Sequence, residues 1–209
     1  ANNTAVGTIA LDANSTGSNN TGLGRGALGS NTTASNNTAV GYSSLGANTT
    51  GAENTVLGYN ALDANTTANN NVAIGAYAAT ANTTGASNTV VGYAALGANT
   101  TGNYNVAIGQ DALNDNTTAS NNTAVGYRSV RDNTTGANNT GIGFFALISN
   151  TTGTENVAVG SEALSTSTTA GYNTAVGYAA MKDCTTGSIN VAVGREAMQN
   201  ITTGAKNVA

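Results

Sequence analysis

The stretch NTAVGYSSLGANTTGAE, residues 37–53, decides how this chain folds, because its pattern recurs along the whole sequence. The Asn that opens it has counterparts every 17 residues, at 3, 20, 37, 54, 71, 88, 105, 122, 139, 156, 173 and 190, and again at 207. Twelve complete repeats therefore occupy residues 3–206 without an insertion or a deletion, and residues 207–209 form a partial one. We number each repeat from this Asn, so that Asn37 stands at coil position 1 and Glu53 at coil position 17.

An uninterrupted period of this length predicts a parallel β-solenoid, in which each repeat makes one circuit and stacks on the circuit before it. An inserted residue would shift every hydrogen-bond ladder beyond it. Seventeen residues are too few for a helix pair, and the many β-branched, Asn and Gly residues disfavour a single helix. Collagen is excluded because the chain lacks Pro and a three-residue glycine period. We expect one all-β domain, residues 1–209, as a segment of a longer fibre.

Each circuit can be outlined from its residue types. Positions 2–4, such as Thr38-Ala39-Val40, are β-favouring residues and predict a short strand. Gly follows at position 5 in all twelve repeats, either because a turn needs a positive φ or because another backbone passes close by. Positions 8 and 9 are an apolar pair, and positions 12–15, such as Asn48-Thr49-Thr50-Gly51, predict a second turn where another short strand could form.

Composition and charge exclude several classes of function. Ala, Thr, Asn and Gly make up 132 of the 209 residues, His is absent, and there is one Cys. We therefore expect no His-based acid–base catalysis, no His or Cys metal cluster, no cofactor and no enzymatic activity. The net charge of −4, with only six Lys and Arg, argues against nucleic acid as a partner. No apolar run approaches the roughly 20 residues of a membrane-spanning helix.

The distribution of charge separates the outside of the coil from the rest. All sixteen charged residues stand at positions 6, 7, 10, 11 or 17. The strand at positions 2–4 is uncharged on both faces, so it needs cover on both sides, and a thin coil supplies only one. We expect a homo-oligomer, with three-fold symmetry favoured over two-fold, whose seam is position 4: Val40, Leu57, Ile74, Val91, Ile108, Val125, Ile142, Val159, Val176 and Val193. In the alternative, position 4 fills the coil and position 3 is a surface position that tolerates small residues.

Asn occupies position 12 in nine repeats and predicts a file of side-chain amides that hydrogen-bond from coil to coil. A turn role for the same residues is equally compatible with the sequence. The Asn-Thr-Thr triplets also match the N-glycosylation acceptor pattern, which we interpret as turn chemistry that happens to match. Ser167, Cys184 and Ile201 replace Asn in the last three repeats, and we expect Cys184 to be a small buried thiol. The predicted ladder comprises Asn14, Asn31, Asn48, Asn65, Asn82, Asn99, Asn116, Asn133 and Asn150.

Two further files could face a ligand. Aromatic residues at position 6 could stack on sugar rings or on another protein, or could simply cover the coil beneath them. Thr at positions 13 and 14 forms regular arrays of the kind that some ice-binding solenoids use, although only one Thr per coil would point outward. Gly22-Leu23-Gly24-Arg25-Gly26 lacks the strand–helix context of a dinucleotide site, and the acidic residues are too scattered for calcium-binding nonapeptide repeats. The position-6 aromatics are Tyr42, Tyr59, Tyr93, Tyr127, Phe144 and Tyr178.

The pentapeptides Asn-Val-Ala-Ile-Gly, at 71–75 and 105–109, and Asn-Val-Ala-Val-Gly, at 156–160 and 190–194, closely resemble the head repeats of trimeric autotransporter adhesins. That resemblance covers the whole chain and implies a left-handed parallel β-roll, with three chains around one axis on a bacterial surface. The longer pattern is also similar to repeats of phage and bacterial tail-fibre-like proteins, which often end in a self-cleaving chaperone domain. The period of 17 differs from that of the adhesin repeats, and the chain has no neck, coiled-coil stalk or anchor.

These observations predict an extracellular, cell-surface or virion-borne structural segment that projects or mediates attachment. Its expected partners are other copies of itself and a surface glycan or protein of a host.

Overall fold

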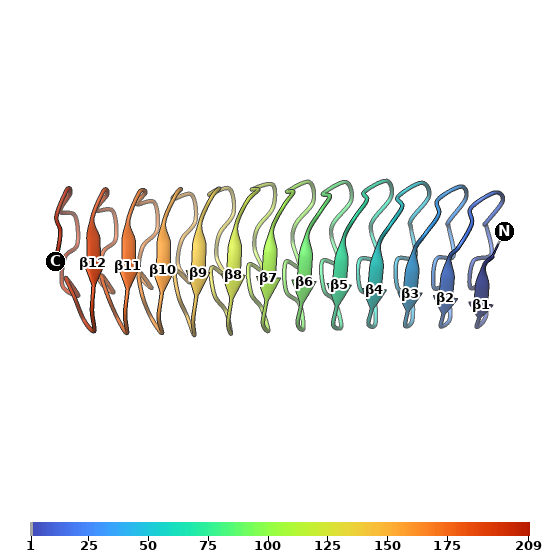
Figure 1. Cartoon of the computed structure of the whole chain (residues 1–209), viewed down its shortest axis with the longest axis horizontal. Helices are drawn as coiled ribbons and strands as arrows, with labels where there is room; N and C mark the ends of the chain where they lie inside the picture. Colours follow the sequence, from blue (N-terminus) through green and yellow to red (C-terminus); the bar gives the residue numbers. More distant parts are fainter. Residues whose placement is uncertain (1) are drawn as a thin grey trace.

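The computed structural model describes residues 2–209 as a rod built from one continuous parallel β-sheet and the turns that connect its strands. Figure 1 shows the twelve strands side by side in chain order, with the two termini at opposite ends of the rod. The strands are β1 Thr4–Val6, β2 Thr21–Leu23, β3 Thr38–Val40, β4 Thr55–Leu57, β5 Val72–Ile74, β6 Thr89–Val91, β7 Val106–Ile108, β8 Thr123–Val125, β9 Thr140–Ile142, β10 Val157–Val159, β11 Thr174–Val176 and β12 Val191–Val193. The described residues contain no helix. The predicted parallel β-solenoid is confirmed.

The register of the sheet follows directly from the sequence period. Thr38 pairs with Thr55 and Val40 with Leu57, so each residue lies beside the residue 17 positions further along. The same offset holds between every pair of neighbouring strands and continues to a final bridge between Val191 and Val208. Each strand is three residues long, and positions 12–15 contain bends without a second strand.

Position 3 fills the interior of the coil. Ala39, Val56 and Ala73 have no more than 1% of their surface exposed, whereas position 4 is exposed or half-buried in every coil. The alternative in which position 4 fills the coil is therefore wrong. Opposite the strand, the apolar pair at positions 8 and 9, such as Ala61 and Leu62, completes the core. Small residues at position 8, and in most coils at position 3, leave room for a large side chain at position 9. Ala79 is an exception at position 9, and the coils on either side of it carry Val56 and Val90 at position 3.

Both reasons considered for the glycine at position 5 apply. Gly92 has φ of +140°, a value that L side chains rarely adopt. A Cβ on Gly92 would also collide with the carbonyl group of Gly109 in the next coil. Position 9 is more unusual, because its residues are not glycine and yet adopt a left-handed backbone conformation. Leu62, Leu96 and their equivalents have φ near +50°. A left-handed conformation aims each of these buried leucines at the strand.

Candidate functional site

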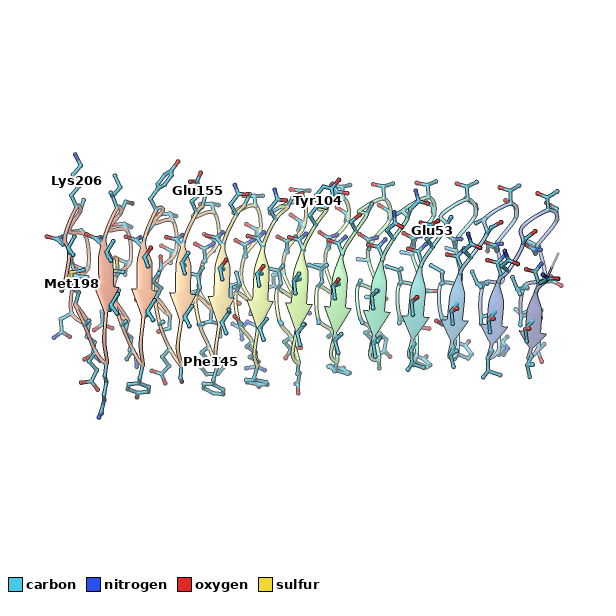
Figure 2. All side chains as sticks on the ribbon, in the orientation of Figure 1. Glu53, Tyr104, Phe145, Glu155, Met198 and Lys206 are labelled. Carbon is cyan, nitrogen blue, oxygen red and sulfur yellow. The ribbon has the colours of Figure 1, made fainter. Side chains whose placement is uncertain are left out.

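Because all coils share one register, every coil position forms a straight file of side chains along the rod (Figure 2). The candidate functional surfaces are therefore files, each spaced by the separation of strands in a sheet, about 4.8 Å. We use five names: the asparagine ladder for position 12, the strand face for positions 2 and 4, the aromatic file for position 6, the threonine file for position 14, and the rim for position 17.

The asparagine ladder is an internal structure. Asn48 Nδ2 donates to Asn31 Oδ1 at 2.9 Å, and the same bond joins all nine asparagines from Asn14 to Asn150, at 2.7 to 3.3 Å. Asn48 Nδ2 also donates to the carbonyl oxygen of Gly51, which closes the second turn. The ladder and turn roles thus occur together in the same residues.

The Asn-Thr-Thr triplets offer no accessible acceptor nitrogen in the folded ladder. Asn65 and Asn99 are completely buried, and each Nδ2 donates both to the previous ladder residue and to a carbonyl oxygen three residues ahead. A sugar attached to that nitrogen would have to displace both bonds and enter the core. The ladder ends where Ser167 replaces Asn, and Asn150 Oδ1 and Ser167 Oγ are both buried without a hydrogen-bond partner.

Asn at position 1 forms a second buried file, whose side chains bond to backbone and in several coils also to one another. The backbone N–H of Asn54 donates to Asn37 Oδ1 at 2.9 Å, and Asn37 Nδ2 reaches across the coil to the carbonyl oxygen of Gly51 at 2.8 Å. Side chains that make both bonds tie the start of a strand to the next coil and to the second turn. Asn122 is an exception, because its Nδ2 is buried without a hydrogen-bond partner. The satisfied polar groups of this file stabilise the stack and present nothing to a ligand.

The strand face is an uncharged surface on the outside of the rod. It carries Thr or Val at position 2 and Val, Ile or Leu at position 4 in every coil. Leu57 and Val193 are 48% and 61% exposed, and the predicted seam residues Val40, Ile74 and Val125 are half-buried by their neighbours along the file. The face measures on the order of 500 Å² from the strand dimensions, and it is only partly apolar, because eight of its twelve position-2 residues are Thr.

The aromatic file is largely stacked on itself. The rings of Tyr42 and Tyr59 are stacked with their centroids 5.2 Å apart. Tyr77, which stands at position 7, packs edge-to-face against both Tyr59 and Tyr93. Arg25 Nη1 donates to Tyr42 Oη at 2.8 Å and its guanidinium lies over the ring. Sugar stacking needs an open ring face, and most of these faces are occupied by a neighbouring ring or a guanidinium.

A second aromatic group of the same file lies further along the rod. Tyr127 stacks on Phe144, and Phe145 at position 7 packs against both of them. Arg128 lies over Tyr127, and Arg195 lies over Tyr178, the last aromatic residue of the file.

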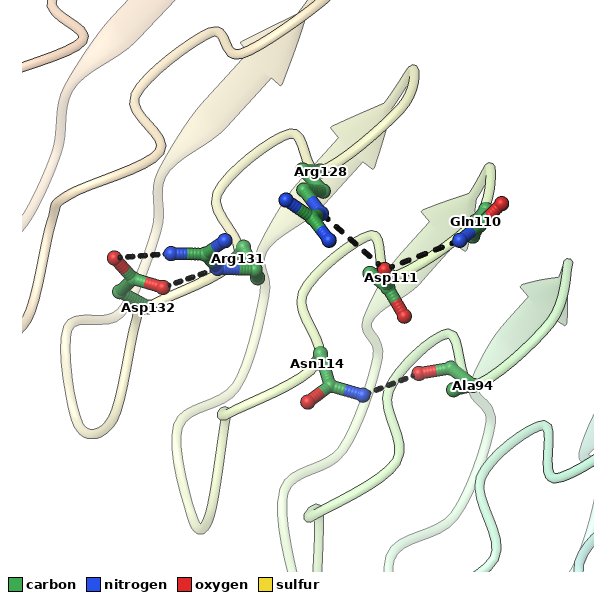
Figure 3. A network of polar contacts seen from close by, with 7 residues as sticks. All are labelled: Ala94, Gln110, Asp111, Asn114, Arg128, Arg131 and Asp132. Carbon is green, nitrogen blue, oxygen red and sulfur yellow. Dashed lines mark hydrogen bonds and ion pairs between the residues drawn. The ribbon is translucent and has the colours of Figure 1, made fainter.

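Charged side chains gather on the same side of the rod as the aromatic file. Figure 3 shows Arg128 pairing with Asp111 of the previous coil, and Arg131 pairing with Asp132 beside it. Burial raises the pKa of the Asp115 carboxyl, and the nearby Asp132 carboxylate raises it further. The two arginine–aspartate ion pairs are partly exposed and therefore contribute little to the stability of the fold. Among residues 2–209 there is no group of three or more His, Cys, Asp or Glu side chains placed to hold a metal ion.

A shallow hollow of about 370 Å³ lies over the first four coils on this side. It exists because Gly26, Gly29 and Gly46 leave space between Asp12 and Asp63. Burial raises the pKa of the Asp63 carboxyl, which is the most shielded acid in the hollow.

Cys184 is fully buried, and its thiol pKa is also raised by burial.

The threonine file and the rim are the two most regularly exposed files. Thr at position 14 is exposed in all twelve coils, whereas Thr at position 13 is mostly half-buried and donates to a carbonyl of the next coil, as Thr49 does to Thr66. The rim contains two aromatic residues that the sequence interpretation overlooked, Tyr104 and Tyr172. Position 17 also carries Glu53, Glu155 and a terminal Lys, which marked it as a charged surface and obscured the aromatics.

The sequence matches no known protein family, no curated protein and no solved structure. Residues 2–209 include no apolar helix of membrane-spanning length. The candidate functional surfaces are therefore those of the rod itself.

Proposed function

We propose that this chain is a structural segment of an extracellular or virion-borne fibre or adhesin, in which three left-handed β-rolls pack around a common axis and hold an attachment surface away from its base. The observation that carries the proposal is the strand face. It runs the length of the rod without a charge, and its aliphatic position-4 side chains are exposed or half-buried in a single chain. Covering it with two further copies removes apolar surface from water, which is the dominant favourable term in association.

The internal files support a mechanical role. Ladders of backbone, asparagine and threonine hydrogen bonds connect each coil to the next. Pulling two coils apart requires breaking all of them together, so the rod resists extension. The resemblance to adhesin heads and tail-fibre repeats agrees with this role. The flanking sequence separates the two: a stalk with an anchor indicates a surface adhesin, and a chaperone domain indicates a tail fibre.

Charging the seam tests the assembly. We expect the wild-type segment to sediment with three times the 20.4 kDa mass of one chain. Replacing Ile108→Lys and Val125→Lys places two cations in the seam, and burying unpaired charge costs several kcal/mol, so this variant should dissociate. Gln110→Lys with Thr118→Lys adds the same charge on other exposed positions of one of these coils and should leave the mass unchanged.

Sedimentation equilibrium gives the answer. A stable folded wild-type monomer would refute the shared seam, and a wild-type dimer would replace three-fold with two-fold packing. A seam variant that keeps the mass of its control would show that another face makes the contact.

Ice binding is a second candidate, favoured by the threonine file alone. Twelve exposed Thr side chains in a straight line present hydroxyl and methyl groups at the regular coil spacing, about 4.8 Å. If this file binds ice, the segment produces thermal hysteresis and shapes ice crystals, and Thr101→Lys with Thr118→Lys abolishes both effects. Their absence from the wild-type protein disposes of the candidate.

A further inference from the structure

The rim offers a surface that differs from every other file. Figure 2 shows Glu53, Tyr104, Glu155 and Lys206 along one edge of the rod, away from Phe145 on the opposite edge. Position 17 is exposed in every coil except at Ser87, which is half-buried. Its residues all have φ between +57° and +63°, so the backbone turns sharply there and lifts each side chain off the coil.

Two tyrosines on this rim have open ring faces. Tyr104 is 66% exposed and Tyr172 is 57% exposed, and they are the most exposed aromatic side chains of the described chain. No ring or cation of residues 2–209 packs on either of them, in contrast to the aromatic file. A left-handed conformation is also unfavourable for tyrosine, so these residues are strained as well as exposed.

The rim between the two tyrosines is polar and unoccupied by protein contacts. Asn121, Asn138 and Glu155 lie there in successive coils, all exposed, and their side chains make no hydrogen bond within the described residues. The neighbouring position 16 behaves differently, since Ser120 Oγ accepts the backbone N–H of Asn103. The rim side chains thus keep their hydrogen-bonding capacity for an external partner.

We propose that the rim from Tyr104 to Tyr172 binds a neutral oligosaccharide laid along the rod. The two rings stack on sugar faces at the ends of the site, and the amides and the carboxylate between them bond to hydroxyl groups. Four coil spacings separate the two rings, so the site is about 19 Å from ring to ring and spans five coils. Glu155 disfavours an acidic glycan, and the only rim cation, Lys206, lies two coils beyond Tyr172. The inference rests on the proposed function, because a projecting fibre presents this rim to a surface.

The test uses the whole segment and defined glycans. A glycan array should identify a neutral class that binds, and titration calorimetry with oligosaccharides of that class from two to six sugars should follow. We expect affinity to rise until the chain reaches both rings and then to level off. Tyr104→Ala and Tyr172→Ala should each weaken binding about tenfold, because each removes one stacking contact. Tyr104→Phe should retain binding, since the ring provides the stacking.

Tyr59→Ala is the matched control, because it removes a tyrosine of the aromatic file and should leave affinity unchanged. The inference would be overturned if the segment bound no neutral glycan on the array, or if Tyr59→Ala weakened glycan binding as much as the rim substitutions do. Binding of a protein ligand alone at this rim would overturn it as well. Sedimentation separates it from the proposed fibre. A trimer that binds no glycan contradicts only the rim site, and a monomer that binds glycan contradicts only the shared seam.

Discussion

The same residue type has three roles in this rod, set by its place in the coil. Asn99 at position 12 donates to a side-chain amide oxygen and closes the second turn, whereas Asn71 at position 1 accepts the backbone N–H of Asn88 in the next coil. Asn121 at position 17 adopts a left-handed conformation at the surface, which Asn tolerates better than most residues. Composition alone cannot distinguish these roles. They become predictable only when each Asn is assigned a coil position.

Restoring one missing ladder residue should stabilise the rod. Ser167→Asn places an amide donor opposite Asn150 Oδ1, which is buried without a partner. We expect an increase of about 1–2 kcal/mol in the free energy of unfolding, because an orphaned acceptor is satisfied. Urea denaturation measures it. Ser167→Ala is the control and should be nearly neutral, since the Ser hydroxyl is itself unpaired; equal effects of the two substitutions would contradict the ladder argument.

Strain at the rim gives a second prediction. Ile189 is β-branched, 52% exposed, and has φ of +61°. Ile189→Asn should stabilise the fold by about 1 kcal/mol, because Asn adopts this conformation at lower cost and little packing is lost. The reverse change at the same coil position, Asn138→Ile, should destabilise by a similar amount. Thermal melts that shift in the same direction for both would show that backbone strain is not the cause.

At the scale of the coil, the strand and its glycine were predictable and the other half of the circuit was not. Positions 2–4 and Gly at 5 have one residue class in every repeat, so a strand and a turn follow from local preference. Which strand face lies inside was not decided by hydrophobicity, because Ala39 and Val40 are both apolar. The left-handed leucines, such as Leu96, were not foreseeable, since packing overrides their local preference.

The candidate surfaces were predictable to different degrees. Position 6 was correctly marked as aromatic, but stacking between coils depends on ring orientation, which the sequence does not contain. Tyr104 and Tyr172 escaped notice because they are two aromatics in a file of mostly polar residues. Their importance comes from open ring faces and spacing, which only coordinates provide.

The glycines at position 5 of successive coils lie so close together that a larger residue there should destabilise the turn after the strand. Gly92→Ala should destabilise by more than about 3 kcal/mol, because the new Cβ collides with the backbone of Gly109 and needs a φ that Ala avoids. In the same coil, the Cβ of Gly97→Ala would meet the flexible Asn114 side chain and lie 3.2 Å from the Ala94 carbonyl oxygen, so this change should cost less, about 1 kcal/mol. Comparable losses in chemical denaturation would show that position 5 is not specially constrained.

At the scale of the whole molecule, stability should depend on register more than on length. Each strand pairs only with its neighbours, so the rod behaves as a one-dimensional stack. Deleting residues 88–104 removes one coil and joins Ser87 to Asn105 in phase, and it should preserve a cooperative thermal transition. Deleting residues 88–103 leaves one extra residue and misaligns everything beyond it. Circular dichroism should show a clear loss of cooperativity for the second deletion only.

The asparagine ladder has a consequence for the two ends of the rod. Every bond in it runs the same way, with a later residue donating to an earlier one, as Asn31 does to Asn14. Nine amide dipoles therefore point in one direction, with an unused donor facing one terminus and an unused acceptor facing the other. The ladder therefore has an electrical polarity along its length, as a helix does, although the position-13 threonine hydroxyls donate in the opposite direction. A neighbouring segment could continue this alignment only head to tail, so the coil carries a built-in sense of direction for the fibre.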